Sequence, residues 1–221
     1  MDFDFSPIAD NWRFFAGGLG ITVLLSVVSA VTSIAAGLLI ALARMYGPGW
    51  ARKLLVFYID SMRAVPVLVV LVWIYFALPL LTGIAFPPFW AALVALTLHI
   101  AAYAAEVFRA GIESVRPGQT RAALALGMSR AQILRKVVLP QATVRMLPAF
   151  GSILTIAIKD TAIATVIAVP ELMHRAETIA GQSYRPVEVY TAVMVAFFCI
   201  LFPVTRAVDR LYQRVAHLGR S

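Results

Sequence analysis

Two adjacent charged residues inside a long apolar stretch are the residues of this chain that most clearly suggest a chemical role. Lys159 and Asp160 interrupt residues 146–170, which contain no other charged residue. A charge at the centre of a bilayer costs about 2.5–3.5 kcal/mol on insertion scales, so such groups face a cavity or a partner. Adjacent helical residues point about 100° apart, so at least one of the two should reach a neighbouring helix, water or a ligand. A satisfied inter-helix ion pair, or a position at the membrane interface, is the structural alternative.

A second group of polar residues occupies the end of another apolar stretch. Glu106 and Arg109 are three residues apart, a spacing that permits an ion pair on one helical face. Tyr103 lies one turn earlier and could reach a cavity. Pro66 lies within a third apolar stretch, where it cannot donate to the carbonyl near Met62. Such breaks border cavities in membrane proteins, although a kink for packing explains Pro66 equally well.

The sequence shows no motif for phosphate binding, metal binding or nucleophilic catalysis. The sequence contains no GxxxxGK[ST] phosphate-binding loop and no HExxH motif. No histidine or cysteine has a second ligand at metal-binding spacing, and no nucleophile–base pair is visible. We therefore expect no catalytic residue, no metal site and no cofactor on this chain.

The elements that position these residues are membrane spans. Of the 221 residues, 61% are hydrophobic and 14% are charged, against about 25% charged in soluble domains. A hydrocarbon core needs a helix of roughly 20 apolar residues. The sequence predicts one all-α polytopic membrane domain over residues 1–221. Its five expected transmembrane helices cover residues 19–43, 54–79, 88–108, 147–168 and 187–208.

The distribution of basic residues predicts the orientation of these spans. The formal net charge is +8, and 15 of the 19 Lys and Arg residues fall in segments 44–63, 106–145 and after 205. Basic residues collect on the cytoplasmic side, so the N-terminus is expected outside and the C-terminus inside. This pattern indicates a lipid bilayer rather than nucleic acid as the partner of the positive charge.

The polar segment 112–141 is unusually structured for a loop between spans. Gly127 follows a helical pattern and can adopt the left-handed conformation that ends a helix. Ser129 and Gln132 have the spacing of a capping box for a second helix, which we expect to stop before Pro140. Two helices this short need packing to be stable. Docking into a partner protein and lying on the lipid surface explain the pattern equally well.

Several stretches resemble the ABC importer permeases, and more specifically the branch that transports polar amino acids. Ala122-Ala123, Gly127 and Leu139-Pro140, spaced AA–x3–G–x11–LP, resemble the conserved pattern of that family's cytoplasmic loop. The other matching stretches are AYAAEVFRAGIESVRPGQ (102–119), ALGMS (125–129), VVLPQA (137–142), LPAFGS (147–152), KDT (159–161), DSMRAVPVLV (60–69) and YFALP (75–79). The resemblance extends from about Gly18 to the C-terminal tail.

The resemblance implies a division of labour between chains. The chain would be the permease subunit of an inner-membrane importer, and loop 112–141 would be a cytoplasmic coupling helix that contacts an ATPase dimer. ATP and Mg²⁺ would be bound by that partner, and a second permease and an extracellular binding protein would complete the complex. The residues implied for ATPase coupling are Arg121, Ala122, Ala123, Gly127, Ser129, Leu139 and Pro140.

The same resemblance implies a substrate cavity beside the KDT motif. Lys159 is suited to the carboxylate of an amino acid, and Asp160 is suited to its ammonium group. The expected pathway residues are Lys159, Asp160, Thr161, Pro66, Val65, Arg63, Tyr103 and Glu106.

The chain departs from the family pattern at several positions. Arg121 stands where the family usually has Glu, which reverses a charge in the coupling loop. Ala64-Val65 replaces Gly-Thr, and Val70 stands where Gln is common. Ala162 replaces a small polar residue after the KDT motif. These apolar replacements leave open which amino acid is carried and whether a paired permease holds the main site.

Two other classes of function are alternatives. A self-contained secondary amino acid carrier or channel could use Lys159 and Asp160 in an ion-coupled path, but such carriers usually show internal repeats, and we find no convincing repeat. A membrane-embedded enzyme or scaffold has no support from the residues present.

Overall fold

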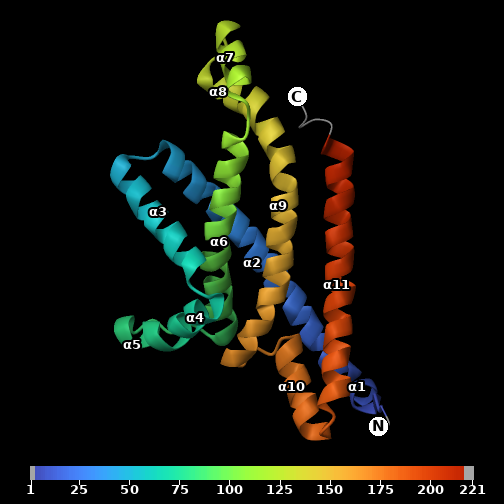
Figure 1. Cartoon of the computed structure of the whole chain (residues 1–221). Helices are drawn as coiled ribbons and strands as arrows, with labels where there is room; N and C mark the ends of the chain where they lie inside the picture. Colours follow the sequence, from blue (N-terminus) through green and yellow to red (C-terminus); the bar gives the residue numbers. More distant parts are fainter. Residues whose placement is uncertain (1–2, 217–221) are drawn as a thin grey trace.

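The computed structural model describes residues 3–216, and every regular element in that range is a helix (Figure 1). The helices are α1 (Ser6–Asp10), α2 (Trp12–Tyr46), α3 (Gly49–Ala64), α4 (Val67–Val72), η1 (Trp73–Ala77), α5 (Leu78–Thr82), α6 (Pro88–Glu113), α7 (Pro117–Ala125), α8 (Arg130–Ile133), η2 (Leu134–Val138), α9 (Leu139–Asp160), η3 (Thr161–Ile167), α10 (Leu172–Ser183) and α11 (Pro186–Val215). The prediction of an all-α fold is confirmed.

Helix α6 is the centre of the fold. It lies between α2 and α9, and its small residues Ala91, Ala95 and Ala104 are completely buried. Small side chains let membrane helices approach closely, because van der Waals packing rather than the hydrophobic effect holds helices together in lipid. Helix α11 packs on the outer side of α9, where Val208 lies against Gly151 (Figure 1).

Four helical segments are long and apolar enough to cross a membrane. They are α2, α6, the continuous segment Arg130–Ile167 and α11, and they contain four of the five predicted spans. The second predicted span, 54–79, is not one helix. Helix α3 ends at Ala64, α4 begins at Val67, and the two halves are bent by 108°.

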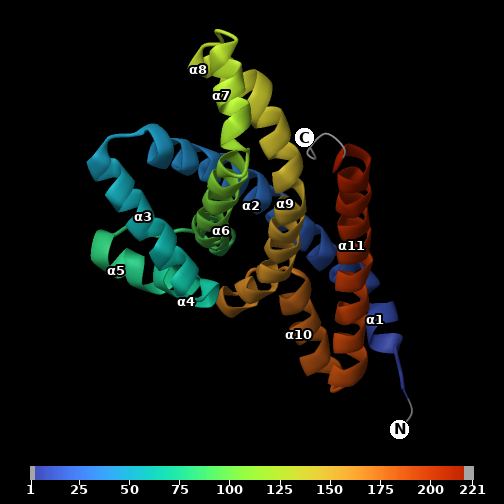
Figure 2. The same ribbon diagram turned by 45° about the horizontal axis from the view of Figure 1, so that its top comes forward.

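Pro66 explains this break. The residue before a proline is pushed out of the α region, and Val65 is extended with φ −95° and ψ 133°. Pro66 is also extended and precedes the first turn of α4, where its missing N–H costs nothing. Residues 67–82 therefore run across the end of the bundle rather than through it (Figure 2).

The predicted helical hairpin in loop 112–141 forms as α7 and α8. Gly127 adopts the left-handed conformation with φ 77°, and Ser129 and Gln132 form the complete capping box. The predicted stop before Pro140 is wrong. Residues 134–138 form a π-turn in which Leu139 donates to the Leu134 carbonyl, and the chain continues directly into α9. The π-turn accommodates Pro140, which follows it directly and has no N–H to donate to the preceding turn.

The two ends of the bundle differ in structure. Helices α7 and α8 project beyond the other helices at one end, the end toward which α11 runs (Figure 1). Helices α1, α5 and α10 lie at the opposite end.

At that opposite end, α10 is tied to α2 by a buried carboxylate. Glu171 caps α10 by accepting from the backbone N–H groups of Met173 and His174, both at 2.8 Å. Thr22 of α2 donates to the Glu171 carboxylate at 3.4 Å and accepts from Leu172 N–H at 3.0 Å.

Candidate functional site

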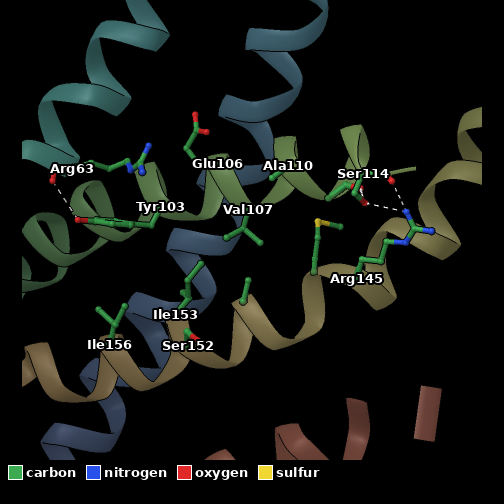
Figure 3. A pocket seen from close by; sticks show the side chains of 13 residues that line it. Arg63, Tyr103, Glu106, Val107, Ala110, Ser114, Arg145, Ser152, Ile153 and Ile156 are labelled. Atoms are coloured by element: carbon green, nitrogen blue, oxygen red, sulfur yellow. Dashed lines mark hydrogen bonds between the residues drawn. The ribbon is translucent and has the colours of Figure 1, made fainter. Parts of the chain in front are cut away.

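The largest group of predicted site residues lines a cavity between α6 and α9. The cavity has a volume of about 510 Å³, and its lining combines apolar side chains with a few polar ones (Figure 3). The predicted residues Arg63, Tyr103 and Glu106 are brought together here. The polar residues Ser114, Arg145 and Ser152 also line this cavity and were not predicted.

The broken second span contributes directly to one wall of this cavity. The Tyr103 hydroxyl donates a hydrogen bond of 3.4 Å to the Arg63 carbonyl, in the last turn of α3 before the Pro66 break. The Arg63 guanidinium lies 5.7 Å from the centre of the Tyr103 ring, within the range of a cation–π contact. The hydroxyl of Tyr103 thus serves as a donor to a backbone carbonyl one residue after Met62, beside the Pro66 break.

The Glu106 carboxylate forms an ion-pair network with two arginines. Arg44 of α2 and Arg109 both donate to its carboxylate, with Arg109 Nη2 at 2.7 Å. The predicted Glu106–Arg109 pair is confirmed. In Figure 3 the Glu106 carboxylate points to the side of α6 away from Ile153 of α9, whereas Val107 points toward α9. Glu106 therefore stabilises the packing of α2 on α6 and does not present a free charge to the cavity.

Arg145 closes the other end of the cavity. Its guanidinium donates to the Ser114 carbonyl, just after the end of α6, and also approaches the Ser114 hydroxyl at 3.5 Å (Figure 3). This bond ties the start of α9 to the base of the α7–α8 hairpin. The only sequence signal for Arg145 was a basic residue immediately before the apolar stretch 146–170, which did not reveal its partner.

Lys159 lines a different cavity, between α9 and α11. This second cavity has a volume of about 490 Å³, and its other polar residues include Thr155, Thr205 and Asp209. Ser152 and Ile156 line both cavities, so the two spaces meet along one face of α9. The Lys159 side chain forms no hydrogen bond or ion pair with residues 3–216.

The other predicted pathway residues lie in different surroundings: at the end of α9, in the buried core and at the break after α3. Asp160 ends α9 and is half-buried. Thr161 is completely buried, and its hydroxyl donates to the Ile158 carbonyl at 2.7 Å. Thr161 therefore does not line either cavity in this conformation, because its hydroxyl satisfies its own helix. Val65 packs against the main core, and Pro66 is exposed at the helix break.

The predicted coupling residues lie on and around the projecting hairpin. Arg121, Ala122, Gly127, Ser129 and Pro140 are exposed, and Leu139 is 38% exposed. Ala123 is an exception among the predicted contacts, because it is buried in a small core that includes Val115, Ile133 and Val138. Its role is to hold the hairpin together. The exposed apolar surface comes instead from Leu126, 82% exposed, and Leu124, 50% exposed, which were not among the predicted coupling residues.

Residues 3–216 hold no cluster of three or more His, Cys, Asp or Glu side chains that could bind a metal ion. The polar groups that line the two cavities are hydroxyls, a lysine, an aspartate, a glutamate and arginines, which can bind and orient a polar solute.

Comparison with known proteins agrees with this architecture. Residues 33–217 match the family model of the binding-protein-dependent transport system inner membrane component. The chain is 36% identical over 217 residues to the glutamine transport system permease protein GlnP of Escherichia coli (strain K12), covering 97% of this chain and 99% of that protein. It is 34% identical to the L-cystine transport system permease protein TcyL of Bacillus subtilis (strain 168), covering 90% of this chain and 85% of that protein.

A solved structure has the same fold over its full length. The crystal structure of an amino acid ABC transporter with histidines superimposes with a TM-score of 0.91 at 33% identity, covering 97% of this chain and 100% of that one. With a family match over most of the chain and relatives of nearly equal length, the chain belongs to the binding-protein-dependent transport system inner membrane component family.

Proposed function

We propose that this chain is the transmembrane permease subunit of an ATP-driven importer for polar amino acids. The observation that carries the proposal is the α7–α8 hairpin, which projects from one end of the bundle and exposes Leu126 at its tip. Its own core and its capping box make the hairpin a folded part rather than a loose loop. A rigid apolar projection of this kind is suited to docking into a groove of another protein.

The relatives support the class of substrate. Proteins named for transport of glutamine, L-cystine and arginine are 34–36% identical to this chain over at least 90% of its length. In our proposal, the α-carboxylate of the solute pairs with Lys159, whose ammonium forms no hydrogen bond or close ion pair with the described residues. Asp160 receives the solute's ammonium group. Ser152, which lines both cavities, is placed to contact the solute as it passes between them.

The ATP-dependent step belongs to another subunit in this proposal. A partner ATPase dimer binds ATP and Mg²⁺, and it pushes on the hairpin through Arg121, Leu124 and Leu126. Because Arg145 bonds to Ser114 at the base of the hairpin, a push on the hairpin is transmitted to α9 and to the cavity walls. A second permease, identical or paralogous, and an extracellular binding protein complete the complex.

The chain is a multi-pass membrane protein, and we propose the cytoplasmic membrane as its location. We place α7 and α8 on the cytoplasmic side and α1 and α10 outside. The basic residues support this orientation, since Arg116, Arg121, Arg130, Arg135 and Lys136 all belong to the hairpin end.

Reconstitution tests this proposal. The chain is inserted into liposomes with and without a candidate ATPase and a candidate second permease, and uptake of radiolabelled glutamine, arginine and cystine is measured with a candidate binding protein present. We expect uptake only when the ATPase and internal ATP are both supplied. Uptake by this chain alone, driven by a proton or sodium gradient, would favour a secondary carrier and refute the proposal.

A further inference from the structure

A separate basic cavity lies at the hairpin end of the bundle, away from both cavities described above. It has a volume of about 270 Å³ and is formed where α2 ends, α3 begins and α6 ends. Its lining residues are Arg44, Met45, Arg52, Arg109 and Glu113. Three guanidinium groups thus converge on one small space, from three different helices.

The charges around this cavity do not cancel. Arg44 and Arg109 share Glu106, and Arg109 also pairs with Glu113 at 2.5 Å. Arg52 is exposed, and its guanidinium forms no hydrogen bond or ion pair within the described part of the chain. Three arginines therefore face two carboxylates, which leaves one positive charge and several N–H donors free. Arginine binds phosphate with paired N–H groups in a planar fork.

The surroundings of the cavity mark the boundary between membrane and water. Tyr46 is 63% exposed and Trp50 is 69% exposed at the corner between α2 and α3. Exposed tyrosine and tryptophan concentrate at the headgroup level of a bilayer. Trp50, Leu54 and Phe57 follow one another at helical spacing on α3, and the latter two are 60% and 73% exposed. This apolar stripe lies on the face of α3 opposite Arg52 and the buried Ile59, so it faces the lipid while Arg52 faces the cavity.

We propose that this cavity binds the phosphate group of an anionic phospholipid, with Arg52 as the principal contact. Arg44 and Arg109, held in place by Glu106, form the rear wall. The exposed Tyr46 and Trp50 favour a lipid over a soluble phosphate, because they place the cavity at the headgroup level of the bilayer. Basic pockets between transmembrane helices are suited to such headgroups. The assignment to the cytoplasmic leaflet rests on the orientation proposed above, whereas the site itself does not.

Native mass spectrometry of the detergent-purified full-length chain tests the site without any transport assay. Dioleoylphosphatidylglycerol and dioleoylphosphatidylcholine are titrated onto the wild type and onto Arg52→Gln, Lys53→Gln and Glu113→Gln. Lys53 is the matched control, because it is exposed and basic on the same turn but does not line the cavity. Glu113→Gln removes a negative charge from the cavity and should act in the opposite direction.

We expect selective retention of phosphatidylglycerol that falls about tenfold in Arg52→Gln, the loss of one charge-assisted contact. Retention should rise in Glu113→Gln and should change less than about twofold in Lys53→Gln. The increase in Glu113→Gln cannot come from misfolding, so it separates binding from stability.

Equal retention of both lipids, or equal loss in Arg52→Gln and Lys53→Gln, would overturn the proposal. Displacement of phosphatidylglycerol by millimolar inorganic phosphate would assign the site to a soluble anion and refute the lipid. Failure of ATP-driven uptake would leave these measurements unaffected, so the two proposals fail separately.

Discussion

Gly37 of α2 faces Ala104 of α6 with no room for a side chain between the helices. A Cβ atom placed on Gly37 would lie 2.5 Å from the Ala104 Cβ and 3.0 Å from the Ala101 carbonyl oxygen. Two of the atoms that it would meet belong to the backbone of α6, so they cannot move aside without moving the helix. This crossing positions Arg44, two turns later on α2, against Glu106.

Gly37→Ala should therefore destabilise the chain by about 1–3 kcal/mol, the usual cost of overpacking a close contact. Gly20→Ala is the control, since Gly20 lies on the same helix with nothing within 4 Å of an added Cβ. Thermal unfolding in detergent should show a lower midpoint for Gly37→Ala and an unchanged or slightly higher one for Gly20→Ala. Equal midpoints for the two variants would contradict the close approach of α2 and α6.

Gly127→Ala should weaken the projecting hairpin. Gly127 has φ 77°, which costs a residue with a Cβ about 1–3 kcal/mol. Binding of the ATPase subunit and ATP-driven uptake should both fall, while the thermal midpoint of the remaining bundle changes little. Gly118→Ala is the matched control, because Gly118 lies within α7 and has open space around it. Gly127→Asn should keep most activity, since Asn tolerates the left-handed region.

Lys159→Met should impair uptake while leaving the fold intact. It removes an ammonium group that forms no hydrogen bond or close ion pair with residues 3–216, and it keeps the apolar stem of the side chain. A lost charge-assisted contact with the solute is worth about 1.5–3 kcal/mol, so KM for the amino acid should rise about tenfold or more. Lys159→Arg, which keeps the charge, should be closer to wild type. Normal uptake and substrate preference in Lys159→Met would remove Lys159 from the pathway.

Glu171 should make the stability of the chain depend on pH. Burial is the largest influence on its pKa and raises it above the usual 4.5, while hydrogen bonds from Met173, His174 and Thr22 partly oppose the rise. The folded chain then holds this proton more tightly than the unfolded chain does. Its stabilising contribution is present below pH 4.5 and is lost as pH rises through the folded pKa.

Unfolding midpoints of the wild type and Glu171→Gln, measured from about pH 4 to about pH 8, check this expectation. The amide side chain of the variant stays neutral throughout, so the midpoint of the wild type should fall relative to that of the variant as the pH rises. A wild-type midpoint that rises relative to the variant over this range would show that the hydrogen bonds outweigh burial and that the pKa is lowered instead.

The sequence by itself determined the features that depend on near neighbours in the chain. Hydrophobic periodicity and length predicted the apolar helices, because a bilayer span needs about 20 apolar residues wherever it lies. Gly127, the capping box of Ser129 and the Glu106–Arg109 pair were predictable because their partners lie within a turn or so of the same chain segment. The break at Pro66 was visible as well, although its 108° angle was not.

Only the tertiary structure decided which distant residues meet. Arg44 and Glu106 are 62 residues apart, and Arg145 and Ser114 are 31 apart. Their pairing depends on how α2, α6 and α9 cross. The same crossings put Lys159 in the cavity beside α11 and bury Thr161, although the two residues are two positions apart. Helical periodicity gives the direction of each side chain on its own helix, but the cavity that it faces depends on which helix packs there.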